Sequence, residues 1–341
     1  MIRGQQGQAG DPVRRAMRGG PDHRLCIAPM MEWTDRHCRY LLRLIAPHAL
    51  LYTEMIVAAA IEHGNADRLL EFHENEHPVA LQVGGSDPTQ LAYAALAGAR
   101  AGYDEINLNV GCPSGRVQAG RFGVCLMREP GLVAACVAAM RNSVDLPVTI
   151  KTRIGVDNDD SFGFLLDFAS TVADAGCDRL IVHARKAWLK GLSPKENRDV
   201  PPLDYDIVLR LRDHLPALPI VVNGGIDDAT VFATRLKQFS GVMVGRAAYQ
   251  RPMVLRELEQ VLYPETQLGT RQQIVEAYLP YIESQLARGV RLHSMTRHML
   301  GLFQSRPGAR YWRRQLGQIA SRPDAGIDVI KSTLADVATA A

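Results

Sequence analysis

Short apolar and β-branched runs recur along residues 25–249, separated by segments with helical periodicity. Most runs are continuously apolar, which is typical of parallel strands buried on both faces. Eight strands alternating with helices predict a (β/α)8 TIM barrel. A doubly wound sheet is the alternative, but the lack of a charged edge strand favours closure. The eight candidate strands are residues 25–30, 50–55, 78–85, 105–113, 147–155, 179–185, 219–225 and 241–249.

Helix signals fill the intervening segments. Asp87 followed by Pro88 marks a helix start, because an acidic residue caps the free N–H groups and proline fits the first turn. Residues 164–175 and 228–236 are two further candidates. Beyond about residue 256 the strand signal ends and the remaining runs have helical spacing.

The chain therefore divides into three expected parts. Residues 1–23 are rich in Gly, Arg and Gln and are expected to form a flexible extension. Residues 24–255 are expected to form the barrel, and residues 256–341 a small all-helical domain docked on it.

Charge is spread unevenly over these parts. The whole chain carries a net charge of +3. Residues 286–322 contain eight arginines and no Asp or Glu, so this segment is +8 and the remainder is −5. From residue 309 on, apolar residues share one helical face and arginines another, which favours a polyanion as partner. The apolar face carries Trp312, Leu316 and Ile319, and the basic face Arg310, Arg313 and Arg314.

Composition excludes several protein classes. Hydrophobic residues make up 47% and charged residues 22%, which is typical of a packed globular protein. No apolar run reaches the roughly 20 residues of a membrane span, and the first residues lack the apolar stretch of a signal peptide, so a cytoplasmic location is expected. The six cysteines show no C-x-x-C pair, so we expect neither a disulfide framework nor a metal site.

The active site of a TIM barrel lies at the carboxyl ends of its strands. The first strand ends in Pro29, Met30 and Met31, which could lie against a flat aromatic ring or form a tight turn with packed methionines. The third ends at Gln82, whose amide could pair with both a donor and an acceptor of a cofactor.

The fourth strand leads into Cys112 and a glycine-rich loop. A thiol with an unperturbed pKa near ~8.5 is mostly protonated at neutral pH and could act as a general acid. A buried structural thiol is the other interpretation. Glycines 115, 120 and 123 also fit a lid that closes on substrate.

Cationic side chains end the fifth and sixth strands, where Lys151 and Arg153 precede His183 and Arg185. Such groups stabilise an anionic cofactor or intermediate. They could also form a polar barrel layer, and Lys151 could be a Schiff-base lysine.

The seventh and eighth strands end in a glycine pattern typical of a TIM-barrel phosphate site. Its backbone N–H groups and one arginine would hold the phosphate. Together with Lys151 and His183 it favours FMN over a sugar phosphate. The pattern comprises Asn223, Gly224, Gly225, Gly245 and Arg246.

Several ordered motifs resemble the tRNA-dihydrouridine synthases, and their long forms resemble the A-type subfamily. They are APMMEWTDRHCRYLLR, LQVGGSDP, NLNVGCPSGRVQAGRFGVCLM, IKTRIG, HARKAWLKGLSPKENR, NGGI and VGRAAY. The resemblance covers residues 25–330. Gly115 departs from it, since an acidic residue would be expected after Cys-Pro-Ser.

The resemblance implies an FMN-bound barrel with NADPH as reductant and uridines 20 and 20a of the tRNA D-loop as targets. It also implies a monomer without metal. Cys112 would donate the proton, and Asn109 would lie beside the uridine. FMN would be held by Pro29, Met30, Met31, Gln82, Lys151, His183, Asn223, Gly224, Gly225, Gly245 and Arg246. The tRNA would contact Lys195, Arg198, Arg310 and Arg313.

Three rival functions remain. A small-molecule FMN reductase of the dihydropyrimidine or enoate type shares the barrel but has no use for an acid-free arginine segment. A lysine-dependent aldolase would form a Schiff base at Lys151. A non-catalytic tRNA-binding protein would keep the scaffold without a flavin.

Overall fold

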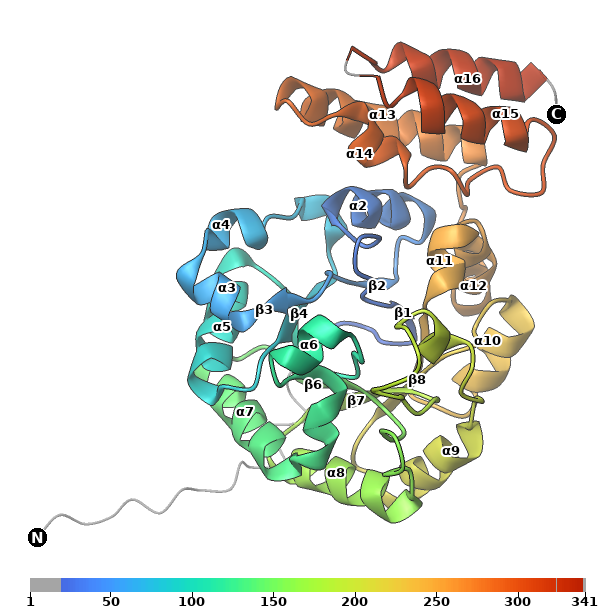
Figure 1. Ribbon diagram of the computed structural model, residues 1–341. Coiled ribbons are helices and arrows are strands. Elements are labelled where there is room, and N and C mark those ends of the chain that lie inside the picture. Colours follow the sequence, from blue (N-terminus) through green and yellow to red (C-terminus); the bar gives the residue numbers. More distant parts are fainter. Residues whose placement is uncertain (1–19, 323, 340–341) are drawn as a thin grey trace, which may run out of the picture.

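The computed structural model describes residues 20–322 and 324–339 of the chain (Figure 1). Most of the predicted N-terminal extension, residues 1–19, lies outside the described residues. His23, which the prediction places in that extension, is instead buried and hydrogen-bonded to Glu105 at 2.6 Å. The barrel therefore begins before residue 24.

Eight parallel strands close into the predicted TIM barrel. Strand β2 pairs with both β1 and β4, which closes the sheet, and the two-residue strand β3 extends one end of it. All eight predicted strands are present, each shorter than its apolar run. The strands are β1 (Leu25–Ile27), β2 (Leu50–Tyr52), β3 (Ile56–Val57), β4 (Val79–Gly84), β5 (Glu105–Val110), β6 (Val148–Arg153), β7 (Arg179–His183), β8 (Ile220–Asn223) and β9 (Gly241–Val244).

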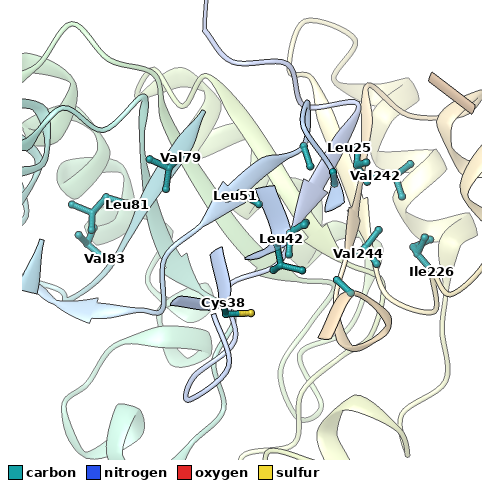
Figure 2. Packing of buried hydrophobic residues seen from close by; sticks show 14 of the residues in the cluster. Leu25, Cys38, Leu42, Leu51, Val79, Leu81, Val83, Ile226, Val242 and Val244 are labelled. Atoms are coloured by element: carbon teal, nitrogen blue, oxygen red, sulfur yellow. The ribbon is translucent and has the colours of Figure 1, made fainter. Parts of the chain in front are cut away.

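Alternate residues of each strand face opposite sides of the barrel wall. One set packs outward against the helices, as Leu25, Val79 and Val242 do in Figure 2. The other set fills the barrel interior as a separate small cluster that includes Tyr52 and Met243. The continuous apolar runs are explained by burial on both faces.

Helices follow the strands around the outside of the barrel (Figure 1). The predicted helix starts are present: the Asp87 side chain caps α5 and the Asp228 side chain caps α10. The helices of this part are α2 (Arg36–Ile45), α3 (Ala58–His63), α4 (Ala66–Leu69), α5 (Pro88–Ala101), α6 (Gly115–Ala119), α7 (Pro130–Ser143), α8 (Phe162–Asp174), α9 (Tyr205–His214), α10 (Ala229–Leu236), α11 (Arg246–Gln250) and α12 (Val254–Leu262), with 3-10 turns η1 (Glu74–Glu76), η2 (Gly123–Arg128) and η3 (Glu196–Arg198).

The remaining helices form a separate bundle beside the barrel (Figure 1). They are α13 (Arg271–Ala287), α14 (Leu292–Thr296), α15 (Ala309–Arg314), the π-helical turn η4 (Gln315–Ile319) and α16 (Asp328–Thr339). The predicted boundary at residue 256 falls inside α12, which packs against α10 and α11 of the barrel. The bundle of the described residues therefore begins after α12.

The bundle docks on α2 through aromatic rings and ion pairs. Tyr40 of α2 stacks on Tyr281 of α13 with ring centroids 4.0 Å apart. Asp35, the N-cap of α2, pairs with Arg297 at 2.5 Å and with His298 at 3.0 Å. Burial alone would raise the pKa of the Asp35 carboxyl, but these two partners hold it well below its usual value. The docking contact is thus both apolar and charged.

Candidate active site at the barrel mouth

Interstrand register brings the predicted strand-end residues together at the barrel mouth. Asn109 of β5 lies opposite Lys151 of β6, and His183 of β7 lies opposite Asn223 of β8. The Lys151 ammonium donates to Asn223 Oδ1 at 3.2 Å. Gln82 of β4 accepts a hydrogen bond from Asn109 Nδ2 at 2.8 Å. One ring of polar side chains therefore joins five strands.

The loops after β8 and β9 carry glycines that leave backbone exposed to this ring. Gly224 has φ +111°, and a Cβ there would come within 2.8 Å of the His183 ring. Gly225 also has a positive φ, +66°. Gly245, at the end of β9, has no atom within 4 Å of the position of a Cβ. The backbone at Gly245 is thus open to close approach, which is the condition for phosphate contacts.

Cys112 lies in a tight turn at the end of β5. The Oδ1 atom of Asn109 accepts the backbone N–H groups of Gly111 and Cys112, at 3.1 and 3.0 Å. The Cys112 side chain is half-buried, and its thiol donates to Ser114 Oγ at 3.5 Å. Unlike Cys26, Cys38, Cys136 and Cys177, it is not enclosed in the core.

Hydrogen bonds of Gln118 and a close backbone approach at Gly123 hold the loop that carries Cys112. Gln118 of α6 donates to the carbonyls of Pro113 and Leu189, at 2.8 and 3.1 Å, and so joins the loops after β5 and β7. Gly123 has φ +75°, and a Cβ there would collide with the carbonyl oxygen of Cys112 at 2.6 Å. A glycine is therefore required at residue 123 for the loop to fold back on the cysteine.

The Arg153 side chain hydrogen-bonds the backbone of both loops, those after β5 and β7. Its guanidinium donates to the carbonyls of Gly111, Lys186 and Asn197, at 3.0, 3.0 and 2.9 Å. Asn197 is fully buried and hydrogen-bonds both the N–H and the carbonyl of Trp188. Arg153 is therefore committed to backbone carbonyls, whereas the Lys151 ammonium donates to the side chain of Asn223.

Positive charge accumulates here with little compensation. Burial, followed by the nearby Arg153, lowers the pKa of Lys151 to about 7. Burial and the surrounding cations also hold the pKa of His183 well below its usual value, so its imidazole is neutral at pH 7. Arg246 pairs with Asp199 at 2.7 Å, whereas neither Lys151 nor Arg153 pairs with a carboxylate among the described residues. The arrangement suits an anionic ligand.

Comparison with known proteins identifies the chain. The profile of the family described as "Dihydrouridine synthase (Dus)" matches residues 26–339. The chain belongs to the dihydrouridine synthase family. Enzymes of this family are flavin-dependent oxidoreductases, in agreement with the cationic mouth.

Curated relatives match over nearly their whole length. A Shewanella oneidensis protein is 56% identical over 319 residues, covering 93% of this chain and 95% of the relative. A Vibrio cholerae protein is 54% identical over 316 residues, covering 92% and 96%. A Xanthomonas campestris protein is 55% identical over 308 residues, covering 90% and 92%. All three carry the name tRNA-dihydrouridine(20/20a) synthase.

In this dihydrouridine synthase family member the remaining predicted residues take different positions. Met30 packs on the interior cluster, whereas the Met31 side chain is 55% exposed. The backbone N–H of Thr34 donates to Met30 O at 2.9 Å, so the residues after Pro29 form the tight turn that the sequence left open. The Met31 side chain thus points away from the packed interior.

The predicted tRNA contacts are exposed in two separate places. Lys195 and Arg198 lie on the loop after β7. The Arg246 guanidinium donates to the backbone carbonyl of Arg198 at 3.3 Å, which places this loop beside the end of β9. Arg310 and Arg313 are exposed on α15, while Trp312 and Leu316 are buried, so the predicted amphipathic pattern is confirmed.

Gly115 begins the short helix α6, and no atom lies within 4 Å of the position of a Cβ there. Space for a side chain is therefore available at this position.

Sequence reasoning missed the interior partners of the site. Glu105, Asn107 and Thr149 are fully buried and hydrogen-bonded inside the barrel below Gln82 and Asn109. The signal was the polar residue at every second position of β5, Glu105–Val110, which marks one face of that strand as polar.

Among the described residues, no group of three or more His, Cys, Asp or Glu side chains could hold a metal ion. Across the same residues, no helix is long and apolar enough to cross a membrane.

Proposed function

We propose that this chain reduces uridine to 5,6-dihydrouridine at positions 20 and 20a of the tRNA D-loop, with FMN as cofactor and NADPH as reductant. The three relatives named above support the reaction and the positions. The observation that carries the proposal is the half-buried thiol of Cys112 at a barrel mouth that also holds the half-buried Lys151 and the buried Arg153.

The mouth fits FMN on structural grounds. Among the described residues no carboxylate pairs with the Lys151 ammonium, which donates to the neutral Asn223 Oδ1, and burial and Arg153 both lower its pKa. A bound anion would supply that partner. The open backbone at Gly245 leaves room for a phosphate beside Arg246, and Gly224 and Gly225 have the positive φ angles that a close backbone turn requires.

Each group would then have one task. The phosphate would be held by Gly224, Gly225, Gly245 and the Arg246 guanidinium. The ring system would contact the turn Pro29–Met31 and hydrogen-bond with Gln82, Lys151, His183 and Asn223. FMN, when bound, supplies a hydride to carbon 6 of the uracil ring.

The protein supplies the proton. As the hydride arrives, negative charge develops on the carbonyl at carbon 4, and the Cys112 thiol donates its proton to carbon 5. Asn109, which holds the Cys112 turn, would lie beside the same base and donate a hydrogen bond to it. Lys151 stabilises negative charge in the site.

The tRNA would be held by charge and shape. Arg310 and Arg313 on the bundle, and Lys195 and Arg198 on the loop after β7, are exposed and available for phosphate contacts. The target base must leave its stack to reach the mouth, which costs a few kcal/mol. Backbone contacts on both sides of the mouth would offset that cost.

The test compares Cys112→Ala with Cys125→Ala, since Cys125 is a second half-buried cysteine on the same loop. We expect Cys112→Ala to bind FMN and tRNA normally but to form dihydrouridine at least about 100-fold more slowly, the usual effect of losing a general acid. Cys125→Ala should stay close to wild type. Dihydrouridine is measured by mass spectrometry of unmodified tRNA incubated with NADPH.

Two results would contradict the proposal. One is turnover of Cys112→Ala within two-fold of Cys125→Ala, which removes the thiol from the reaction. The other is a wild-type protein that purifies without a flavin and does not bind added FMN.

A further inference from the structure

A line of hydrogen-bonded polar side chains runs through the barrel interior, from its floor to the cysteine turn. Thr149 Oγ1 donates to Glu105 Oε1 at 2.6 Å, and Asn107 Nδ2 donates to Thr149 Oγ1 at 2.8 Å. Gln82 Nε2 donates to Asn107 Oδ1, and Asn109 Nδ2 to Gln82 Oε1, both at 2.8 Å. All five side chains are buried.

The Glu105 carboxylate fixes the donor-to-acceptor direction of every hydrogen bond in this line. An ionised carboxylate can only accept hydrogen bonds, so the Thr149 hydroxyl must donate its single proton to Glu105. Thr149 Oγ1 can then only accept from Asn107, which turns the amide oxygen of Asn107 toward Gln82. The same logic turns the oxygen of Gln82 toward Asn109, and therefore the oxygen of Asn109 toward the cysteine turn.

The top of the line is where this direction matters. Asn109 Oδ1 accepts two backbone N–H groups, those of Gly111 and Cys112. If the Asn109 amide were flipped, its NH2 group would face two donors, and two N–H groups would lose their acceptor. With both lone pairs of Oδ1 in use, Asn109 can offer a ligand only an N–H, so the ligand atom there must be an acceptor.

The floor of the barrel keeps Glu105 ionised. Its Oε2 atom contacts His23 Nε2 at 2.6 Å, and Tyr52 donates its hydroxyl proton to Oε1 at 2.7 Å. Burial alone would raise the pKa of the Glu105 carboxyl, but His23, Thr149 and Tyr52 together keep it below its usual value. A buried carboxylate with this many partners is a fixed acceptor.

We propose that Glu105, Thr149 and Asn107 are positioning residues, which set the amide orientation of Gln82 and Asn109 and thereby hold the backbone of Cys112 in place. The inference rests on the proposed function for the roles of Gln82 and Cys112. Its geometric part, the hold on the cysteine turn, stands without any ligand.

The experiment uses Thr149→Val and Thr149→Ser in the full-length protein. Valine removes the hydroxyl at nearly constant volume and breaks the line, whereas serine keeps it. Tyr52→Phe is the matched control, because it removes the other hydroxyl on Glu105 Oε1 while His23 and Thr149, which lower the pKa of Glu105 more than Tyr52 does, remain. Asn107→Leu breaks the line one link higher and is measured in parallel, so that one misfolded variant does not end the test.

Two quantities are measured on each variant. The first is amide hydrogen exchange at Gly111 and Cys112 in the flavin-free protein, referenced to the amides of β7. The second is the dissociation constant for FMN. We expect Thr149→Val and Asn107→Leu to speed exchange at these two amides about ten-fold and to weaken FMN binding several-fold. Thr149→Ser and Tyr52→Phe should stay within two-fold of wild type in both.

The proposal is overturned if exchange at Gly111 and Cys112 in folded Thr149→Val stays within two-fold of wild type. It is also overturned if Tyr52→Phe or Thr149→Ser raises it as much as Thr149→Val does. Failure of the wild-type protein to bind FMN would instead contradict the proposed function, and the exchange measurement would still decide whether the line holds the turn.

Discussion

The molecule presents two sets of cations that differ in burial. At the barrel mouth, Arg153 is buried and Lys151 and His183 are half-buried, and burial lowers the pKa of Lys151 to about 7. On the bundle, Arg310 and Arg313 are exposed, with no ion pair among the described residues. Both sets carry positive charge, but only the first is withdrawn from solvent, in part or fully.

This difference in burial indicates that the two sets of cations bind different kinds of anion. A buried cation is stabilised by one anion held at a fixed place, and the interaction is strong because the surroundings screen it poorly. An exposed arginine gains little from any single fixed partner, but several of them together attract a polyanion and release its counterions. The mouth therefore suits a small cofactor and the bundle a nucleic acid.

The largest expected effect is at Lys151. Replacing Lys151 with Met should weaken FMN binding on the order of a hundred-fold, because a hydrogen bond to a charged group contributes about 1.5–3 kcal/mol. The flavin-free variant should nevertheless be more stable than wild type at pH 6, since the cost of burying the ammonium is removed. Fluorescence titration with FMN and thermal unfolding measure the two effects.

Lys237→Met, an exposed lysine at the end of α10, is the control and should change neither quantity. If Lys151→Met bound FMN as tightly as this control does, the buried cations would have no part in holding the cofactor.

The next effect concerns the exposed set. Arg313→Glu should weaken tRNA binding about ten-fold and reduce the salt slope of binding by about one, because a phosphate contact is lost. FMN binding should not change. Arg100→Glu, the same charge reversal on exposed α5 of the barrel, is the control, and equal losses in the two variants would show that total charge alone sets the affinity.

The smallest expected effect is the pH dependence of FMN binding. In the free protein, Lys151 loses its proton as the pH rises through about 7. A bound anion favours the protonated form, so affinity should be highest below pH 7 and fall several-fold between pH 6.5 and 8. Titrations across this range check it, and an affinity that rises with pH would contradict the assignment of Lys151.

The lowered pKa of Lys151 also makes the stability of the flavin-free protein depend on pH. The pKa of Lys151 is near 7 when folded and near ~10.4 when unfolded. Between these values the unfolded chain binds more protons, so this group makes the fold more stable as the pH rises. The contribution should be absent in Lys151→Met.

Much of the site could be predicted because a parallel barrel gathers all of its strand ends. Gln82, Asn109, Lys151, His183 and Asn223 were identified as strand-end residues, and the register of the strands places them in one ring. The amphipathic pattern around Trp312 was likewise readable, since helical periodicity depends on sequence spacing alone.

Other features depend on contacts between distant segments, which spacing does not encode. The predicted boundary at residue 256 falls inside α12, because α12 has the pattern of any amphipathic helix and its packing on α10 cannot be read from that pattern. For Arg153 the sequence left open a cation for a ligand or a member of a polar barrel layer, and only the carbonyls of the loops after β5 and β7 that surround it decide for a structural role. The burial of His23 depends in the same way on Glu105, 82 residues away.

The most direct test of this division between buried and exposed cations is the salt dependence of both affinities, measured on one preparation of the wild-type protein. The account predicts that tRNA affinity falls steeply with salt, with a logarithmic slope of about 3 or more, whereas FMN affinity changes with a slope of about 2 or less. An FMN affinity that falls as steeply as that of tRNA, or a tRNA affinity insensitive to salt, would contradict it.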